Sequence, residues 1–293
     1  MRLSSIDVGS NAIRQVIVEI SPDGSWKTLK KHREAIRLGS DVFSDGLIHE
    51  NTIKKLIPAF KRMAKNNRKF KVDRSLAFAT SAFRDARNKK PVLLAIYRAS
   101  QIKVSVISGK KEAELIRLAV QSCVAPSSQN SLLIDIGGGS VELTHLRQNK
   151  ILYSRSFKWG VVRTLAECQA QNRKCQHIIN ERIQRNHRLI PKGRFDVAVG
   201  TGGNLDALAR LKLTYLKTGP NTLVTYDELK KIYQQFIKVR PADRATHFAL
   251  KPDRVDVIEP AMYLTLSLMK KYSIKKIKIP GIGLKEGAIL SLL

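Results

Sequence analysis

Two short segments of the chain begin with an aspartate and continue into small residues, Asp7-Val8-Gly9-Ser10-Asn11 and Asp135-Ile136-Gly137-Gly138-Gly139-Ser140. Glycine lets the backbone adopt positive φ and approach a phosphate closely, so that successive N–H groups point at its oxygens. The side chains of Ser10, Asn11 and Ser140 can add donors. One glycine-rich turn is more often structural, but two aspartate-led turns predict a repeated phosphate cradle.

The acidic residues in and beside these turns indicate a metal. Asp7 and Asp135 would repel a phosphate unless a divalent cation lay between them, and Mg2+ is the usual ion beside phosphates. Glu142 follows Ser140 by two positions, where it could serve the same ion or its waters. We therefore expect Mg2+ as the cofactor, with Asp7, Asp135 and Glu142 around it.

Two arginines could clamp the non-bridging phosphate oxygens. Arg14 and Arg84 each lie within a few residues of a predicted junction between strand and turn, and a guanidinium fork matches phosphate geometry. In a chain with 53 Lys and Arg residues, either arginine could instead be merely solvated.

A third glycine-rich segment, Gly200-Thr201-Gly202-Gly203, enters a predicted helix. It could bind a phosphate or a ribose at the helix N-terminus, and a plain tight turn explains it about as well.

Glu112 is the acidic residue at the start of the helix predicted from about residue 111. The residues alone favour a carboxylate that complements the helix dipole. The functional alternative is a general base that deprotonates a water for in-line attack on phosphorus.

The elements that must carry these residues alternate between strands and helices, which predicts an α/β fold. Strands at 4–6 and 14–20 form a hairpin around the first loop, and the same pattern of strand, loop and strand returns at 132–157. Asp135 lies 128 residues after Asp7, a spacing that indicates two similar lobes with a boundary near residues 125–130. In the first lobe, Asn51 is the expected N-cap of a helix. Pro58 either kinks this helix or moves its start to a later residue.

The charge of the chain favours a polyanionic ligand. The 293 residues carry a net charge of +29, which would attract nucleic acid, polyphosphate or a multiply phosphorylated nucleotide. A generally solubilising surface is the alternative. Aromatic residues make up only 6% and are not interleaved with the basic clusters, so we expect no specific nucleic-acid binding.

The remaining composition predicts the compartment. The three cysteines, Cys123, Cys168 and Cys175, show no metal-ligand spacing and are expected to be free thiols in a reducing compartment. No apolar run approaches the length of a membrane span. We expect a cytoplasmic protein with no membrane contact.

At these residues the sequence resembles the Ppx/GppA family of exopolyphosphatases and guanosine pentaphosphate phosphohydrolases, within the superfamily of actin, Hsc70 and the sugar kinases. The motifs that carry the resemblance run in order along nearly the whole chain. They begin in residues 7–14, 37–39, 79–88 and 107–113, and continue in residues 135–143, 200–204, 254–258 and 281–287.

The resemblance implies a fold of two ribonuclease-H-like lobes with the active site in the cleft between them. The first lobe would comprise residues 1–124 and a C-terminal helix at about 283–293, and the second residues 125–282. Glu112 takes the place of the catalytic glutamate, which reverses the preference for a helix-end charge. Asp7, Asp135 and Glu142 match the acidic positions around Mg2+. The implied phosphate-binding set is Gly9, Ser10, Asn11, Arg14, Ser81, Arg84, Gly137, Gly138, Gly139, Ser140, Gly202 and Gly203.

The sequence departs from the family pattern at Lys111, where an acidic residue is usual beside the catalytic glutamate. This lysine should favour the charged form of Glu112 and draw in anions. The chain also lacks the further helical domains of long family members, so we expect lower processivity or a preference for shorter chains.

The resulting hypothesis is an Mg2+-dependent exopolyphosphatase that releases orthophosphate from the ends of inorganic polyphosphate. Hydrolysis of the 5′ γ-phosphate of guanosine pentaphosphate is the alternative within the enzyme class. A non-catalytic sensor of polyphosphate or an alarmone is the alternative outside it. A homodimer is expected from the resemblance alone.

Overall fold

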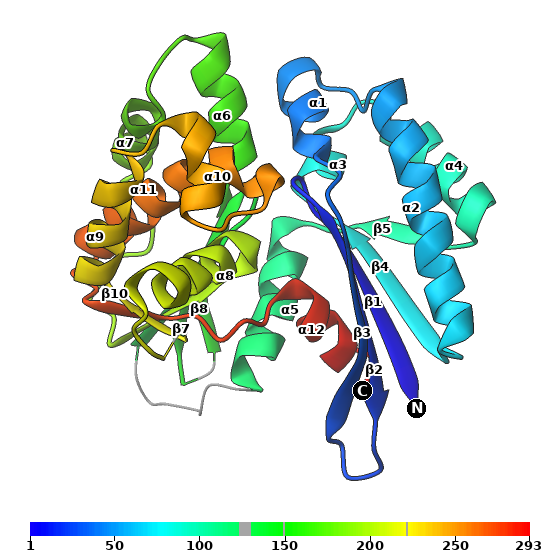
Figure 1. The fold of residues 1–293 in the computed structure, drawn as a ribbon. Helices are drawn as coiled ribbons and strands as arrows, with labels where there is room; N and C mark the ends of the chain where they lie inside the picture. Colours follow the sequence, from blue (N-terminus) through cyan, green and yellow to red (C-terminus); the bar gives the residue numbers. More distant parts are fainter. Residues whose placement is uncertain (123–129, 149, 221) are drawn as a thin grey trace. The chain divides into compact units, whose positions relative to one another are not determined.

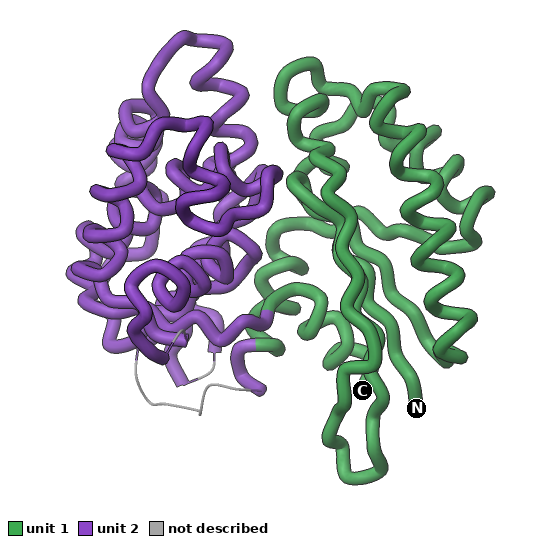
Figure 2. The backbone as a smooth tube through the Cα atoms, in the orientation of Figure 1, with its two compact units in different colours: residues 1–119, 283–293 green, residues 120–282 purple. Residues whose placement is uncertain are grey.

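The computed structural model describes residues 1–122, 130–148, 150–220 and 222–293. The chain divides into two compact units (Figure 2). Unit 1 comprises Met1–Ala119 and Gly283–Leu293, and unit 2 comprises Val120–Ile282.

Unit 1 is built on a five-stranded mixed sheet. Its first three strands, β1 (Arg2–Val8), β2 (Ile13–Ile20) and β3 (Trp26–Glu34), form an antiparallel meander. β4 (Arg74–Ala79) and β5 (Val104–Val106) follow in parallel beside β1, which gives the order β3-β2-β1-β4-β5 (Figure 1).

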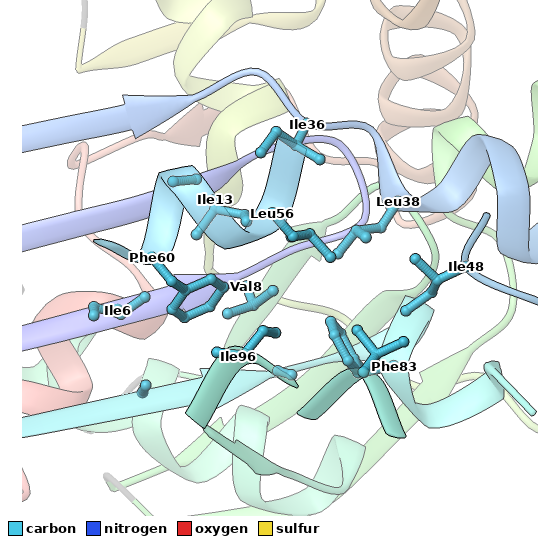
Figure 3. Close-up of a cluster of buried hydrophobic side chains, with 14 of the residues drawn as sticks. Ile6, Val8, Ile13, Ile36, Leu38, Ile48, Leu56, Phe60, Phe83 and Ile96 are labelled. Carbon is cyan, nitrogen blue, oxygen red and sulfur yellow. The ribbon is translucent and has the colours of Figure 1, made fainter. Parts of the chain in front are cut away.

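Alternate side chains of a strand point to opposite faces of a sheet. In this sheet the apolar side chains of both faces are buried. Ile6, Val8 and Ile13 pack with residues such as Phe60 and Phe83 in the larger buried cluster (Figure 3). A smaller cluster contains Leu3, Val16, Val18 and Ile289. The helices of unit 1 are α1 (Leu38–Asp45), α2 (Glu50–Lys69), α3 (Ser81–Asp85), α4 (Lys89–Ser100), α12 (Leu284–Leu290) and α5 (Gly109–Gln121), whose last two residues belong to unit 2.

The start of α2 differs from the prediction. The N-cap is His49 rather than Asn51, and the backbone carbonyl of His49 accepts bonds from the N–H groups of Thr52 and Ile53, both at 3.0 Å. Pro58 lies inside the helix, which runs on through it. An interior proline costs about 3 kcal/mol, and the apolar face that α2 buries in the core offsets that cost.

Unit 2 repeats the sheet of unit 1 and extends it. β6 (Asn130–Ile136), β7 (Val141–Arg147) and β8 (Lys150–Phe157) form an antiparallel meander. β9 (Val197–Thr201) and β11 (Lys276–Lys278) lie parallel to β6, and β10 (Leu223–Thr225) is added at the edge. The order β10-β11-β9-β6-β7-β8 contains the order of unit 1, so the predicted internal repeat is confirmed in the sheet topology.

A capping box at Thr225 opens one of the helices of unit 2. The Oγ1 atom of Thr225 accepts from the Glu228 N–H at 3.2 Å, and Glu228 Oε2 accepts from the Thr225 N–H at 2.8 Å. The helices are α6 (Val161–Ala170), α7 (Cys175–Arg185), α8 (Gly202–Leu211), the π-helix Lys212–Leu216, α9 (Tyr226–Phe236), α10 (Arg244–His247), α11 (Val255–Lys271) and the 3-10 turns Pro241–Asp243 and Pro252–Arg254. None of the described helices of the chain combines the length and apolar character that crossing a membrane requires.

The expectation of free thiols is wrong for two of the three cysteines. Cys168 near the end of α6 and Cys175 at the start of α7 form a disulfide, with their Cα atoms 5.5 Å apart. The short connection between the two helices turns back on itself and brings these cysteines together, which the sequence spacing did not reveal. Cys123 lies outside the described residues.

Candidate functional site

The first aspartate-led loop joins β1 to β2 in unit 1. The N–H of Gly9 donates to the carbonyl of Ala12 at 3.2 Å, which closes a tight four-residue turn. Asp7 lies opposite Arg14 in the strand register, and Arg14 Nη1 is 3.5 Å from Asp7 Oδ2. Burial raises the pKa of Asp7, and the charges of Arg14 and Lys285 partly oppose that rise. Asp7 therefore already has a cationic partner within its own unit.

Ser10 in this loop has an unusual environment. Its backbone carbonyl accepts from the N–H of Gly39 at 2.8 Å, so the first turn of α1 holds the loop. Its side chain is buried, and Ser10 Oγ has no hydrogen-bond partner among the residues that the structure describes. A buried hydroxyl without a partner is costly, which suits a group that is completed by a ligand oxygen.

The second aspartate-led loop joins β6 to β7 in unit 2 with the same geometry. The N–H of Gly137 donates to the carbonyl of Ser140 at 3.0 Å, as Gly9 does to Ala12. Here, however, the residue opposite Asp135 in the register is Glu142, and side-chain oxygens of the two residues lie within 4.8 Å of one another. Two carboxylates on adjacent strands repel each other, so this pair could hold a cation.

Each carboxylate of the pair is held by a hydroxyl from a neighbouring strand. Thr201 Oγ1 donates to Asp135 Oδ1 at 2.7 Å, and Ser156 Oγ donates to Glu142 Oε1 at 2.6 Å. These bonds orient the two carboxylates. A pair of oriented carboxylate oxygens is the donor set of a hard cation such as Mg2+, so the residues of unit 2 fit the metal that the sequence predicts.

The segment Gly200-Thr201-Gly202-Gly203 lies against the same pair, at the junction of β9 and α8. Gly202 has φ of 89°, and a Cβ atom there would be 2.6 Å from Asp135 Oδ1. Both observations require glycine at this position. Gly203 follows as the second residue of α8, so the structure brings this predicted segment beside Asp135.

A buried polar chain anchors the start of α8. Asn204 Nδ2 donates to the carbonyl of Ile136 at 2.7 Å, and Arg254 Nη1 donates to Asn204 Oδ1 at 2.9 Å. Asn204 and Arg254 are both buried. These two hydrogen bonds connect the 254–258 motif, the 200–204 motif and the second loop, three segments that are far apart in the sequence.

Glu112 and Arg84 form an ion pair within unit 1. Arg84 Nη1 is 2.8 Å from Glu112 Oε2 and also donates to the carbonyl of Ile107 at 3.0 Å. The Glu112 side chain is only 8% exposed. Arg84 thus contacts the predicted base, and Ser81 is buried in the first turn of the same short helix, α3.

The departure at Lys111 is resolved by side-chain direction. Lys111 Nζ is 3.4 Å from Glu114 Oε2, one turn along the exposed side of α5. Arg84, by contrast, contacts Glu112 directly.

Two residues that touch the acidic pair were missed by the sequence analysis. Thr201 stood inside a recognised motif, where only its glycines were singled out. Ser156 carried no signal, because its place opposite Glu142 follows from the pairing of β7 with β8. A register-based alignment of the two hairpins would have been needed to find it.

The chain repeats one sheet order with an aspartate-led glycine turn in each repeat, an arrangement that suits a phosphate-handling α/β protein. The model of the Ppx/GppA phosphatase family matches residues 16–293, and the chain belongs to this family. The recognised family, its α/β fold with two mixed sheets, and the class of phosphoanhydride hydrolases are thereby confirmed.

Relatives of known name and structure support this assignment. Exopolyphosphatase 1 of Mycobacterium tuberculosis is 27% identical over 301 residues, which cover 99% of this chain and 88% of the relative. An exopolyphosphatase structure from Cytophaga hutchinsonii is 25% identical with a TM-score of 0.90, covering 100% of this chain and 97% of that one. The Ppx/GppA family member from Aquifex aeolicus is 26% identical with a TM-score of 0.81 and the same coverage.

Proposed function

We propose that the protein is an Mg2+-dependent exopolyphosphatase that releases orthophosphate from the ends of inorganic polyphosphate. The observation that carries the proposal is the Asp135–Glu142 pair beside a glycine-rich loop, in a chain that matches exopolyphosphatases along nearly its full length. The pair supplies a metal site, and the loop supplies donors for phosphate oxygens. The net charge of +29 favours a long polyanion over a nucleotide, because a nucleotide needs only a local pocket.

Glu112 is assigned as the general base from the family resemblance. In the proposed step its carboxylate takes a proton from a water, whose oxygen forms a bond to the terminal phosphorus. The bond from that phosphorus to the bridging oxygen breaks, and the chain leaves with the bridging oxygen. The buried ion pair with Arg84 supports this role, because it holds the carboxylate in one orientation and places a guanidinium nearby.

Asp135 and Glu142 would hold the Mg2+, which when bound offsets the charge of the non-bridging phosphate oxygens. Gly138 and Gly139 would bind those oxygens through backbone N–H groups, and Ser140 through its hydroxyl. In unit 1, Gly9, Ser10 and Asn11 are assigned to phosphate binding on the same grounds. Arg14 is engaged with Asp7, so its proposed contact with phosphate requires it to serve both partners.

Phosphate release tests the proposal directly. The substrates are polyphosphates of defined length, guanosine pentaphosphate and ATP, each with Mg2+ or with EDTA. We expect release from polyphosphate with Mg2+ and none with EDTA. Faster release from guanosine pentaphosphate would instead favour the nucleotide phosphohydrolase, and tight binding of polyphosphate without release would favour a sensor.

The base assignment has a matched pair of variants on α5. Glu112→Gln should lower kcat by about two to four orders of magnitude, the range attributed to general base catalysis. Glu114→Gln removes an equal charge from a partly exposed position of the same helix and should leave kcat unchanged. Full activity of Glu112→Gln would remove Glu112 from the mechanism while leaving the family membership intact.

A further inference from the structure

The first turn of α6 is bonded to the backbone of the second aspartate-led loop. The N–H groups of Val161 and Val162 donate to the carbonyls of Gly137 and Gly138 at 3.2 and 2.8 Å. The N–H of Arg163 shares the Gly138 carbonyl at 3.1 Å, and Arg163 Nε donates to the carbonyl of Gly139 at 2.8 Å. Three consecutive loop carbonyls are therefore turned toward one helix.

These bonds determine where the loop N–H groups point. In a trans peptide unit the C=O of one residue and the N–H of the next point in opposite directions. Carbonyls of Gly137 and Gly138 that face α6 therefore direct the N–H groups of Gly138 and Gly139 away from it. Neither of these two N–H groups has an acceptor among the residues that the structure describes. Adjacent N–H groups aimed the same way form an anion-binding nest.

Gly160 lets the helix come close enough to make these bonds. Its φ of −58° is ordinary, so torsion does not require glycine here. A Cβ atom would instead overlap the carbonyl carbon of Gly139 and the backbone nitrogens of Gly139 and Ser140. Backbone atoms cannot move aside as a flexible side chain can, so any larger residue displaces the loop or the helix.

Unit 1 contains an independent copy of the main contact. α1 follows the third strand of its meander, as α6 does in unit 2. There the N–H of Gly39 donates to the carbonyl of Ser10 at 2.8 Å, and Ser10 holds the loop position that Gly138 holds in unit 2. The same helix-to-loop bond in both repeats indicates a device for shaping the loop.

We propose that Gly160 and Arg163 are positioning residues, which hold the second loop from behind so that its amides face a phosphate. The inference rests on the proposed function for its role in turnover, but the binding of phosphate to the loop is a separate property. Arg163 acts through its bond to the Gly139 carbonyl, and Gly160 acts by leaving room for the helix.

Three variants test the positioning role: Gly160→Ala, Arg163→Met, which has no donor, and Arg163→Lys, which restores one. The readout is the inhibition constant for orthophosphate, measured beside kcat and thermal unfolding. Loss of one charged hydrogen bond should raise this constant about tenfold in Arg163→Met, with recovery in Arg163→Lys. Gly160→Ala should raise it at least as much. Arg188→Ala, an exposed arginine of unit 2, is the charge-matched control and should change nothing.

The inhibition constant separates positioning from a merely structural role. A variant that only destabilises the fold loses active molecules, which lowers apparent kcat and leaves the inhibition constant unchanged. That result in Arg163→Met would overturn the proposal. If Gly160→Ala does not fold, the Arg163 variants still decide the question.

A direct binding measurement distinguishes failure of this inference from failure of the proposed function. Inorganic phosphate should shift the amide NMR signals of Gly138 and Gly139 in the wild-type protein. In Arg163→Met, the dissociation constant for phosphate obtained from that shift should be about tenfold higher. A shift in a protein that does not cleave polyphosphate would keep the positioning role and reject the substrate. Absence of any shift at these amides, with polyphosphate hydrolysis intact, would reject the positioning role alone.

Discussion

Glu142 stands opposite Asp135 in unit 2, where the repeated hairpin of unit 1 has Arg14 opposite Asp7. The two hairpins have loops of equal length and equivalent closing bonds, from Gly9 to Ala12 and from Gly137 to Ser140. One cross-strand position thus changes an ion pair into a pair of carboxylates. This difference supports the proposal that Asp135 and Glu142 hold a cation, because two carboxylates face each other at that position.

The carboxylate pair makes the effect of Glu142→Gln depend on the metal. Without Mg2+ the variant should be more stable than wild type by about 0.2 to 1 kcal/mol, because a like-charge cross-strand contact is removed. With Mg2+ at about 100 times the dissociation constant, wild type should gain about 2.7 kcal/mol, and the variant much less. Thermal unfolding with Mg2+ and with EDTA measures both effects. Glu181→Gln, a partly exposed glutamate of unit 2 paired with Arg173, is the control. Equal stabilisation of Glu142→Gln and wild type by Mg2+ would contradict the metal assignment.

Gly202→Ala should disrupt the same pair from the side of α8. The added Cβ would meet Asp135 Oδ1 at 2.6 Å, in addition to the strain of a positive φ. Gly193→Ala is the matched control, because Gly193 also has positive φ but no atom within 4 Å of its Cβ position. Both variants should lose about 1 to 2 kcal/mol through backbone strain, whereas only Gly202→Ala should lose Mg2+ affinity. Isothermal titration with Mg2+ gives the comparison, and equal affinities in the two variants would show that the contact with Asp135 is unimportant.

The ion pair at the end of β3 predicts a pH-dependent contribution to the stability of unit 1. The hydrogen bond from Arg62 lowers the pKa of Glu34, with a further contribution from His32. Since the folded-state pKa is below the unfolded one, the contribution is present above the ordinary glutamate value and disappears as the pH falls through the folded pKa. Arg62 is half exposed, so Glu34→Gln should cost only about 0.2 to 1 kcal/mol at neutral pH.

Denaturant unfolding of Glu34→Gln and wild type across the acidic range measures this dependence. The stability difference should shrink toward zero below the ordinary glutamate pKa. Glu50→Gln, which breaks a more exposed pair with Lys54, should show a smaller difference at every pH. A difference for Glu34→Gln that stays constant into acid would mean that packing, rather than charge, accounts for it.

Local features of the sequence were sufficient to predict much of the architecture. The order of strands and glycine-rich turns predicted the hairpins around Asp7 and Asp135. These features depend on residues that are close in the chain, so the sequence pattern contains them directly. The N-cap of α2 was misplaced because Asn51 has a side chain that favours caps, although the backbone carbonyl of His49 accepts the first helical bonds.

The disulfide was missed for a different reason. Cys168 and Cys175 belong to two helices, and their approach depends on how the connection between α6 and α7 turns. Sequence spacing does not specify that turn.

The loops, their acidic residues and the family can be read from the sequence alone, because glycine, aspartate and their order in the chain are local chemical information. The groups that surround each carboxylate become known only from the folded chain. Strand pairing placed Thr201 and Ser156 on Asp135 and Glu142, and close packing of α6 placed Gly160 and Arg163 behind the loop. Such contacts depend on strand register and on the approach of segments that are distant in the chain, and no single stretch of sequence encodes them.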